Sequence, residues 1–272
     1  MNRPDLLLVT DPGYPAKGRA YGDEDVLLAE RLGDAFVVTP CPPEEAARRL
    51  DGCDVALVRN SGPVLRHRVA WEAFRARATQ LGRPVVNPLD GRGDQQGKQH
   101  LVEMTVAGMP VIPTVDSVAD LHRLGAPERF VVKPKGGADS IGMEILDSLA
   151  SIELGELVAQ PQVDFVREES YVFVGRAFAY ALRAPDRERR WDLEQWSPTD
   201  ADVAFAQQFV DWNTLDLGVT RVDACRLPDD SLLLVELEDL NPYLSLEVLD
   251  PATLEAVVGR LVADLHQSIG DR

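Results

Sequence analysis

Short apolar runs alternate with amphipathic segments over the first third of the chain. Four runs have the length and the aliphatic composition of buried strands: Leu6–Thr10, Phe36–Thr39, Asp54–Arg59 and Pro84–Asn87. The segments between them predict helices at 24–32, 43–50 and 64–80. In the first of these helices we expect Val26, Leu27 and Leu28 to face a core. Strands that alternate with helices are typical of a small parallel sheet covered by helices.

The pattern becomes mixed after Asn87. A polar loop leads to a helix that begins at Lys98 and reaches Ala107. Further strands are predicted at 111–114, 130–133, 143–146, 157–160 and 171–183, and helices at 118–124 and 201–216. In a final helix, one apolar stripe consists of Leu254, Val257, Val258, Leu261, Val262 and Leu265. We therefore predict an α/β fold class that becomes α+β in the C-terminal part.

Two runs of alternating apolar and polar residues, 221–225 and 232–238, flank the turn residues 228–231 and predict a β-hairpin. We expect Leu227 to face Leu232 across a four-residue loop. The opposed pairs that follow from this register are Asp223 with Glu236 and Arg221 with Glu238. Side chains alternate along a strand, so these four share one face. The apolar reverse face is then formed by Val222, Ala224, Val235 and Leu237.

Three carboxylates crowd the polar face of this hairpin. Like charges about 4 Å apart repel by on the order of 4 kcal/mol at an effective dielectric near 20, so a positive group must compensate. Oxygen ligands beside one arginine suit a hard cation such as Mg²⁺ or Mn²⁺, which usually accompanies nucleotide phosphates. The alternative, a solvated face of an acidic protein, stays open on charge count alone.

Composition narrows the possible partners. The 272 residues carry a formal net charge of −17, which argues against a nucleic-acid backbone or an anionic membrane surface as a partner. A few well-placed lysines still permit a nucleotide. Cys41, Cys53 and Cys225 are odd in number and far apart, so we expect reduced thiols and a cytoplasmic protein. We expect no signal peptide at the first residues and no membrane-spanning stretch.

A lysine at a strand end precedes a glycine-rich loop at 133–142. The ammonium group of Lys133 and the exposed backbone N–H groups of small residues can cradle a phosphate, whereas the alternative is a plain hairpin connection. A second glycine-rich stretch, 91–98, fails as a P-loop because three residues rather than four separate Gly93 from Gly97, and Gln99 follows Lys98. The four histidines are scattered, so no zinc site is predicted.

Four elements in this order resemble the ATP-grasp ligases, specifically the branch that contains glutathione synthetase and D-alanine–D-alanine ligase. The resemblance covers residues 87–272. The four elements are Lys98 before Gly108-Met-Pro-Val-Ile-Pro, Lys133-Pro with its glycine loop, Gln160-Pro161-Gln162-Val163 ahead of Glu169, and Arg221-x-Asp223 followed by Glu236-x-Glu238. The ending Glu236-Leu-Glu238-Asp-Leu-Asn241-Pro resembles a subgroup of natural-product ligases that includes the D-cycloserine-forming cyclo-ligases.

The resemblance implies a role for each element. Lys98 and Lys133 would contact ATP phosphates under a loop containing Ser140 and Gly142. Residues Gln160, Pro161, Gln162 and Val163 would meet adenine, and Glu169 or the adjacent Glu168 the ribose hydroxyls. Asp223, Glu236 and Glu238 would hold two Mg²⁺ (or Mn²⁺) ions, although the position of Glu238 is commonly Asn. Arg221, helped by Arg183, would steady the transferred phosphoryl group.

The resemblance also implies the domains and the activity. Residues 1–86 would form a small parallel α/β domain, followed by two ATP-grasp subdomains at 87–164 and 165–272. The activity would be ATP-dependent joining of a carboxylate to an amine through an acyl phosphate, with small amino-acid-like substrates and a possible homodimer. Our candidate substrate contacts are Arg59, Asn60, Ser61, Asn241 and Ser245. Two alternatives stay open: an intramolecular cyclo-ligase and a non-catalytic nucleotide-binding protein.

Overall fold

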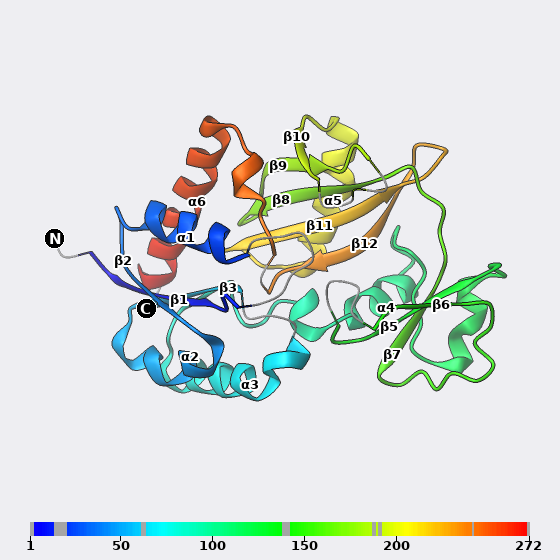
Figure 1. The fold of residues 1–272 in the computed structure, drawn as a ribbon, viewed down its shortest axis with the longest axis horizontal. Helices are drawn as coiled ribbons and strands as arrows, with labels where there is room; N and C mark the ends of the chain where they lie inside the picture. Colours follow the sequence, from blue (N-terminus) through cyan, green and yellow to red (C-terminus); the bar gives the residue numbers. More distant parts are fainter. Residues whose placement is uncertain are drawn as a thin grey trace.

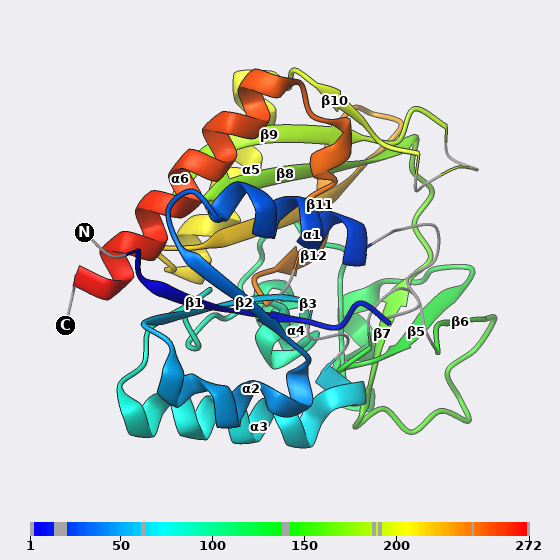
Figure 2. The ribbon, with the colours of Figure 1, turned by 60° about the vertical axis from the view of Figure 1, so that its left-hand side comes forward.

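The computed structural model describes residues 3–13, 21–60, 64–137, 142–186, 189, 192–240 and 242–270. Its strands form three sheets, with the orders β2-β1-β3-β4, β6-β5-β7 and β10-β9-β8-β11-β12. Figures 1 and 2 show the first sheet beside the five-stranded sheet, with the small three-stranded sheet at the opposite end of the molecule. The mixed parallel and antiparallel arrangement confirms the predicted fold class.

The first sheet is parallel, as predicted. Its strands are β1 (Asp5–Thr10), β2 (Val37–Cys41), β3 (Val55–Asn60) and β4 (Val85–Val86). Helices α2 (Pro43–Arg49) and α3 (Val64–Leu81) cover one face of this sheet (Figure 2). Helices α1 (Tyr21–Leu32) and α6 (Pro251–Gly270) cover the other. In α1, Leu28 is buried as expected, but Val26 is 59% exposed because it points away from the sheet.

One core joins the N-terminal and C-terminal parts of the chain. The stripe on α6 packs between the first sheet and the five-stranded sheet, so that Leu8, Leu182 and Leu261 belong to the same buried cluster. Five of the six predicted stripe residues are buried, and Val262 packs against them while partly exposed. The apolar faces of both sheets are therefore removed from water by the same helix.

The five-stranded sheet carries most of the candidate residues. Its strands are β8 (Arg167–Val174), β9 (Ala177–Arg183), β10 (Glu194–Trp196), β11 (Val219–Arg226) and β12 (Leu232–Glu238). The single strand predicted at 171–183 is wrong: Gly175, with a φ of 57°, and Arg176 turn the chain between β8 and β9. Helix α5 (Asp200–Asn213) begins with a capping box between Thr199 and Asp202 and ends three residues before the predicted end.

The third sheet consists of β5 (Phe130–Pro134), β6 (Glu144–Leu146) and β7 (Leu157–Pro161). Helix α4 (Gln99–Val106) lies between this sheet and the hairpin β11–β12 (Figure 1). The strand predicted at 111–114 is wrong, because this segment makes a single isolated bridge, that of Val111 to Leu234. The helix predicted at 118–124 is a 3-10 helix, Val118–Leu124.

Candidate active site

The hairpin β11–β12 has the predicted register where the polar residues lie. Arg221 is opposite Glu238 and Asp223 is opposite Glu236. Towards the turn the register shifts by one residue, so the predicted pairing of Leu227 with Leu232 is wrong and Arg226 faces Leu232. A bulge absorbs the shift on β12, where Val235 is the extra residue. Leu234 rather than Val235 therefore lies beside Ala224 in the buried core.

Arg221 balances two of the three carboxylates. Its side chain is 4% exposed, and Nε and NH2 donate to Asp223 Oδ1 and Oδ2 at 2.9 and 2.8 Å. The same NH2 donates to Glu238 Oε1 at 2.7 Å, while NH1 donates to the carbonyl of Tyr243 at 2.6 Å. The guanidinium group is thus held rigidly on the polar face of the hairpin, between two carboxylates on neighbouring strands.

Lys98 balances the third carboxylate. Its Nζ lies 2.5 Å from Glu236 Oε1 and donates to the carbonyl of Gly137 at 2.7 Å. Burial raises the pKa of the Glu236 carboxyl, but the ammonium groups of Lys98 and Lys133 outweigh burial and lower that pKa to about 2. Glu236 is thus the meeting point of Lys98, Lys133 and the start of the glycine loop after β5, although residues 98 and 236 are far apart in sequence.

The positive charge that the sequence required is supplied within the chain. Among the described residues no group of three His, Cys, Asp or Glu side chains lies in a metal-binding arrangement. The donor set still has the right chemistry for Mg²⁺, because Asp223, Glu236 and Glu238 offer only carboxylate oxygens on one face. A divalent ion here would compete with Arg221 and Lys98 for these oxygens.

The glycine-rich stretch 91–98, which does not match a P-loop, binds a carboxylate of the protein itself, that of Asp239. The backbone N–H groups of Gly93 and Gln95 donate to the Asp239 carboxylate at 2.8 and 3.1 Å. Asp94 returns the contact by accepting from the backbone N–H of Asp239 at 2.7 Å. A Cβ on Gly93 would lie 2.7 Å from the carbonyl of Leu237, so glycine is required there. This loop anchors the chain just before Lys98 to the end of β12.

His100 joins α4 to the hairpin and was missed by the sequence analysis. It is 1% exposed, its Nδ1 lies 2.9 Å from the carbonyl of Gly97, and its Nε2 accepts from the backbone N–H of Leu237 at 3.3 Å. These contacts fit a neutral imidazole with its proton on Nδ1. Burial lowers the pKa of His100, which favours the same neutral form. Its position two residues after Lys98 was the available signal.

The expected adenine segment, 160–163, leaves the end of β7. Gln160 is 2% exposed, and its amide donates to the hydroxyl of Thr114 at 2.7 Å, so this side chain is engaged internally. The backbone N–H of Gln162 donates to the carbonyl of Arg129 at 2.8 Å. Gln162 is exposed, whereas Pro161 and Val163 are half-buried. The segment thus crosses from the small sheet to the five-stranded sheet.

The adjacent acids of β8 lie on opposite faces of the sheet. Ser170 is paired with Asp223, and its hydroxyl donates to Asp223 Oδ1 at 2.6 Å. Glu168 is paired with Cys225 two residues away, so it shares the face of Asp223. Glu169 projects to the reverse face, where its side chain is fully buried. Of the two acids, Glu168 is therefore the one on the polar face of the hairpin.

Arg183 is not beside Arg221. It is paired with Glu169, which places it on the reverse face of the sheet, and its side chain forms an ion pair with Glu194 at 2.8 Å. Its guanidinium carbon also lies 5.5 Å from the centre of the Trp196 ring. The expectation that Arg183 helps Arg221 fails because the two side chains project from opposite faces.

The expected substrate contacts are only partly within the described residues. Ser61 and Asn241 lie outside them, as does the side chain of Asn60. Arg59 is 2% exposed: NH2 donates to Glu24 Oε1 at 2.8 Å and NH1 to the carbonyl of Pro242 at 3.0 Å. Ser245 is 2% exposed and has a φ of 52°, a left-handed conformation that is uncommon for serine.

Residues around Arg59 form a buried acidic cluster. Glu24 also accepts from the backbone N–H groups of Leu244 and Leu246, at 2.9 and 3.0 Å. Asp25 Oδ1 lies 3.4 Å from Arg59 Nε but accepts no hydrogen bond from a described residue. Burial raises the pKa of both Glu24 and Asp25. This cluster stands at the carboxyl ends of β1 and β3, where the strand order of the first sheet reverses.

The loop that would cover the phosphates is described at its two ends. Ser140 lies outside the described residues. Gly142 has a φ of 73°, and a Cβ there would lie 3.0 Å from Cγ of Pro134. Gly142 therefore lies against Pro134 at the end of β5, and glycine permits both the conformation and the close approach.

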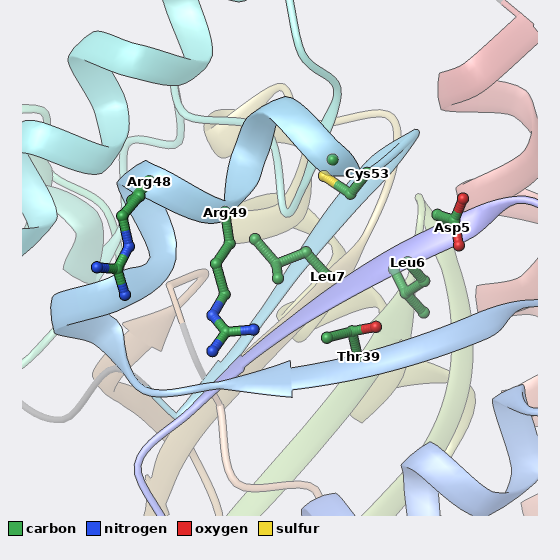
Figure 3. A pocket seen from close by; sticks show the side chains of 8 residues that line it. Asp5, Leu6, Leu7, Thr39, Arg48, Arg49 and Cys53 are labelled. Carbon is green, nitrogen blue, oxygen red and sulfur yellow. The ribbon is translucent and has the colours of Figure 1, made fainter.

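Cavities lined by described residues also lie away from this site, among them the following two. One, of about 320 Å³, lies between α2 and the strands β1 and β2, and Figure 3 shows Arg48 and Arg49 beside it. Both arginines are already paired with Glu45, at 3.5 and 2.6 Å. The other, of about 470 Å³, is lined by β9 and the start of α5. No helix in the described part of the chain has the length and apolar character that crossing a membrane requires.

Comparison with solved structures identifies the fold. D-Cycloserine synthetase DcsG matches with a TM-score of 0.74 at 21% identity, over 96% of this chain and 99% of that chain. The D-alanine–D-alanine ligase of Bacillus anthracis, complexed with ATP, matches with a TM-score of 0.64 at 13% identity, over 98% of each chain. The ATP-grasp ligase PsnB, complexed with a precursor variant, Mg and ADP, gives 0.60 at 14% identity, over 96% of this chain and 100% of that chain.

These matches cover nearly the whole chain, so the protein has the ATP-grasp fold. The resemblance found in the sequence is thereby confirmed at the level of the fold. No protein-family model matches the sequence, and a search of curated proteins finds no significant match.

Proposed function

We propose that this protein is an ATP-dependent ligase that joins a carboxylate to an amine through an acyl phosphate and releases ADP and phosphate. The observation that carries the proposal is the meeting of Lys98 with Glu236 and with the carbonyl of Gly137. Three segments that are distant in sequence converge there: a lysine that can neutralise phosphate, a carboxylate that can hold Mg²⁺, and the start of the glycine-rich loop. The ATP-grasp fold supports the same assignment.

In this proposal the nucleotide lies between the small sheet and the five-stranded sheet. Lys98 and Lys133 neutralise the phosphates, close to the described ends of the glycine-rich loop, Gly137 and Gly142. The backbone of residues 160–163 meets the adenine. We assign the ribose hydroxyls to Glu168 instead of Glu169, because Glu168 shares the face of Asp223 whereas the oxygens of Glu169 are engaged on the reverse face.

Asp223, Glu236 and Glu238 would hold Mg²⁺ in the same complex. Bound there, the ions would neutralise charge on the phosphates. Lys98, displaced from Glu236, would remain within reach of a phosphate, because its other partner is a backbone carbonyl that can be exchanged for a phosphate oxygen. Arg221 keeps a contact to the carbonyl of Tyr243 and can therefore stay in place while it stabilises the transferred phosphoryl group.

The buried cluster at the first sheet supports an amino-acid-like substrate. Two carboxylates surround one guanidinium group, so the cluster formed by Glu24, Asp25 and Arg59 carries a net charge of −1 when ionised. Asp25 Oδ1 accepts no hydrogen bond from a described residue, and it lies where ligands bind in open parallel sheets. We therefore revise the expected role of Arg59 as a carboxylate clamp and assign the substrate ammonium group to Asp25.

A second candidate is an intramolecular cyclo-ligase. The similarity to D-cycloserine synthetase DcsG, together with the Glu236-Leu-Glu238 ending, favours this version of the chemistry. In it, the acyl phosphate and the attacking amine belong to the same molecule. The remaining candidate, a non-catalytic nucleotide-binding protein, would keep the lysines but would have no turnover.

One experiment separates these candidates. Nucleotide products are measured with Mg²⁺ over a panel of amino acids, singly and in pairs, and the organic product is identified by mass spectrometry. ADP formed only with two substrates supports the ligase, whereas ADP with one substrate and the loss of a single water supports the cyclo-ligase. AMP as the product contradicts both. ATP binding without turnover across the panel favours the non-catalytic protein.

A further inference from the structure

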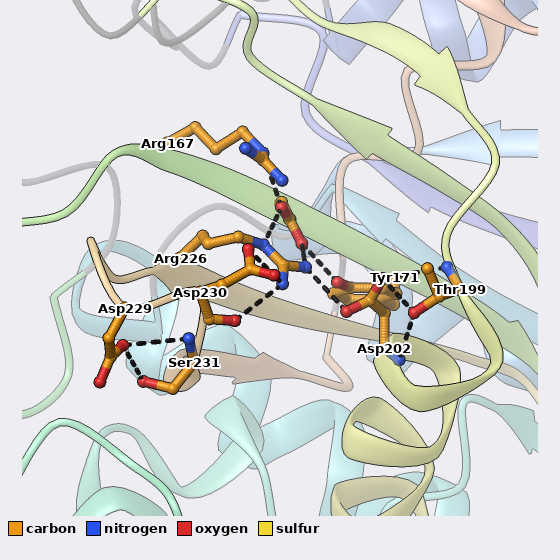
Figure 4. A network of polar contacts seen from close by, with 9 residues as sticks. Arg167, Tyr171, Thr199, Asp202, Arg226, Asp229, Asp230 and Ser231 are labelled. Carbon is orange, nitrogen blue, oxygen red and sulfur yellow. Dashed lines mark hydrogen bonds and ion pairs between the residues drawn. The ribbon is translucent and has the colours of Figure 1, made fainter.

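The buried carboxylate of Glu169 is held by an unusually complete set of donors, drawn in Figure 4. Arg226 binds it in a bidentate manner, with Nε 2.8 Å from Oε1 and NH2 2.7 Å from Oε2. Arg167 Nε donates to Oε1 at 2.7 Å, and the hydroxyl of Tyr171 donates to Oε2. Both oxygens of Glu169 are therefore satisfied within the protein.

Arg226 also reaches beyond β8. Its NH2 donates to Asp202 Oδ1 at 2.8 Å, and Asp202 is part of the capping box that begins α5. Its NH1 donates to the carbonyl of Asp230 in the hairpin turn at 3.0 Å. One guanidinium group thus connects β11, β8, the turn before β12 and the start of α5 (Figure 4). Removing it would release all four elements at the same point.

A buried ion pair of this kind is a better device for fixing register than for adding stability. Taking two charges out of water cancels most of their attraction, and apolar replacements are often as stable. A slip of one residue between paired strands, however, exchanges the two faces of a strand. On β8 such a slip would exchange Glu168 with Glu169. A bidentate contact to Glu169 penalises that slip directly.

We propose that Arg226 is a positioning residue for nucleotide binding. By holding Glu169 on the reverse face, it keeps Glu168 on the face of Asp223, where Glu168 accepts hydrogen bonds from the ribose hydroxyls. Arg226 itself does not touch the nucleotide. The inference rests on the proposed function, because it takes the nucleotide to lie along that face.

The test is the preference of the full-length protein for ATP over 2′-deoxy-ATP. Dissociation constants for both nucleotides are measured by calorimetry with Mg²⁺ for the wild type, Glu168→Gln and Arg226→Lys. Arg176→Lys is the matched control, because it makes the same change at an arginine on the surface, whose ion pairs to Asp211 and Asp216 lie at the far end of the same sheet. The ratio of the two constants does not depend on the folded fraction, so a general loss of stability leaves it unchanged.

We expect the wild type and Arg176→Lys to prefer ATP by about tenfold, the value of a hydrogen bond to a charged group. Glu168→Gln and Arg226→Lys should each lose most of this preference. A wild-type ratio in folded Arg226→Lys, with the ratio lost in Glu168→Gln, would overturn the inference and leave the proposed function intact. No preference in the wild type, or an unchanged ratio in Glu168→Gln, would instead refute the ribose assignment in the proposed function and the inference with it.

A second variant covers the case in which Arg226→Lys does not fold. Arg226→Gln combined with Glu169→Gln replaces the ion pair by two neutral amides and removes the uncompensated charge. If this double variant folds, it should lose the preference for ATP in the same way. If neither variant folds, Arg226 is required for folding itself and the positioning role is rejected.

Discussion

Replacing Glu236 with glutamine should remove the ion pair between Glu236 and Lys98. Glu236 lies 2.5 Å from Lys98, whose side chain is only 6% exposed. The amide of glutamine keeps the shape of the side chain but cannot balance the buried ammonium group. Lys98 would then face two neutral acceptors, the amide oxygen of the glutamine and the carbonyl of Gly137, with no negative charge from residue 236. The substitution is therefore a test of charge, with little change in packing.

The magnitude follows from the pKa of Glu236. Its fall from 4.5 to about 2 on folding corresponds to about 3 kcal/mol, at about 1.4 kcal/mol per pKa unit. Because the pKa is lowered in the folded state, this stabilisation is fully present above about pH 4.5. It is lost as the pH falls from there towards 2. Glu236→Gln should thus be less stable than the wild type by about 3 kcal/mol at pH 7, and the difference should narrow by about 1.4 kcal/mol for each pH unit below about 4.5.

Urea unfolding of both proteins at pH 7 and at pH 3.5 measures these differences. Asp211→Asn, which breaks the exposed pair with Arg176, serves as the control and should cost less than about 1 kcal/mol. The same Glu236→Gln protein should show no Mg²⁺-dependent turnover, because it has lost a proposed metal ligand. Equal stability of Glu236→Gln and wild type at pH 7 would refute the electrostatic reasoning, and retained turnover at ordinary Mg²⁺ concentration would refute the metal assignment.

Three further predictions address other parts of the site. Lys133→Ala should lower ATP affinity or turnover by at least about tenfold, or about 1.4 kcal/mol, and wild-type nucleotide titrations of the folded variant would contradict its assignment to the phosphates. The unfolding free energy should fall as the pH drops below about 6.5, since folding lowers the pKa of His100. In His100→Gln the unfolding free energy should depend less steeply on pH in this range. The same pH dependence in the variant and the wild type would reject this role of His100. Asp25→Asn should raise the Michaelis constant for the amine-bearing substrate by about tenfold with little effect on that for ATP, so equal effects on both would argue against the ammonium subsite.

Local periodicity was sufficient to predict the hairpin and its two polar pairs. The alternation around Asp223 and Glu236 continues for several residues on both strands, so one register satisfies it best. The bulge at Val235 could not be foreseen, because Leu232, Leu233, Leu234 and Val235 are all apolar and fit either face. The error is therefore confined to the turn.

The choice between Glu168 and Glu169 required a third strand. Their faces depend on how β8 is paired with β11, and sequence alternation within β8 alone gives no such pairing. Treating 171–183 as one strand also concealed the turn at Gly175. Recognising that turn would have predicted the antiparallel pair β8–β9. The partners of Lys98 and Arg59 lie more than thirty residues away in sequence, and no local pattern carries that information.

The shared core around α6 has a consequence for how the chain folds during synthesis. Leu6 and Leu8 of β1 are made about 250 residues before Leu261 and Leu265 of α6, one of the two helices that cover their side of the sheet. Until α6 emerges from the ribosome, α1 alone can cover that face of the N-terminal sheet, and the apolar side chains of the five-stranded sheet that pack against α6 remain open to water. Burial of these apolar faces against α6 therefore depends on contacts between distant parts of the chain and forms late. Such contacts form slowly, and the apolar surface stays available for aggregation until they have formed. Chaperone demand during translation should thus be set mainly by α6 rather than by the sheets that precede it.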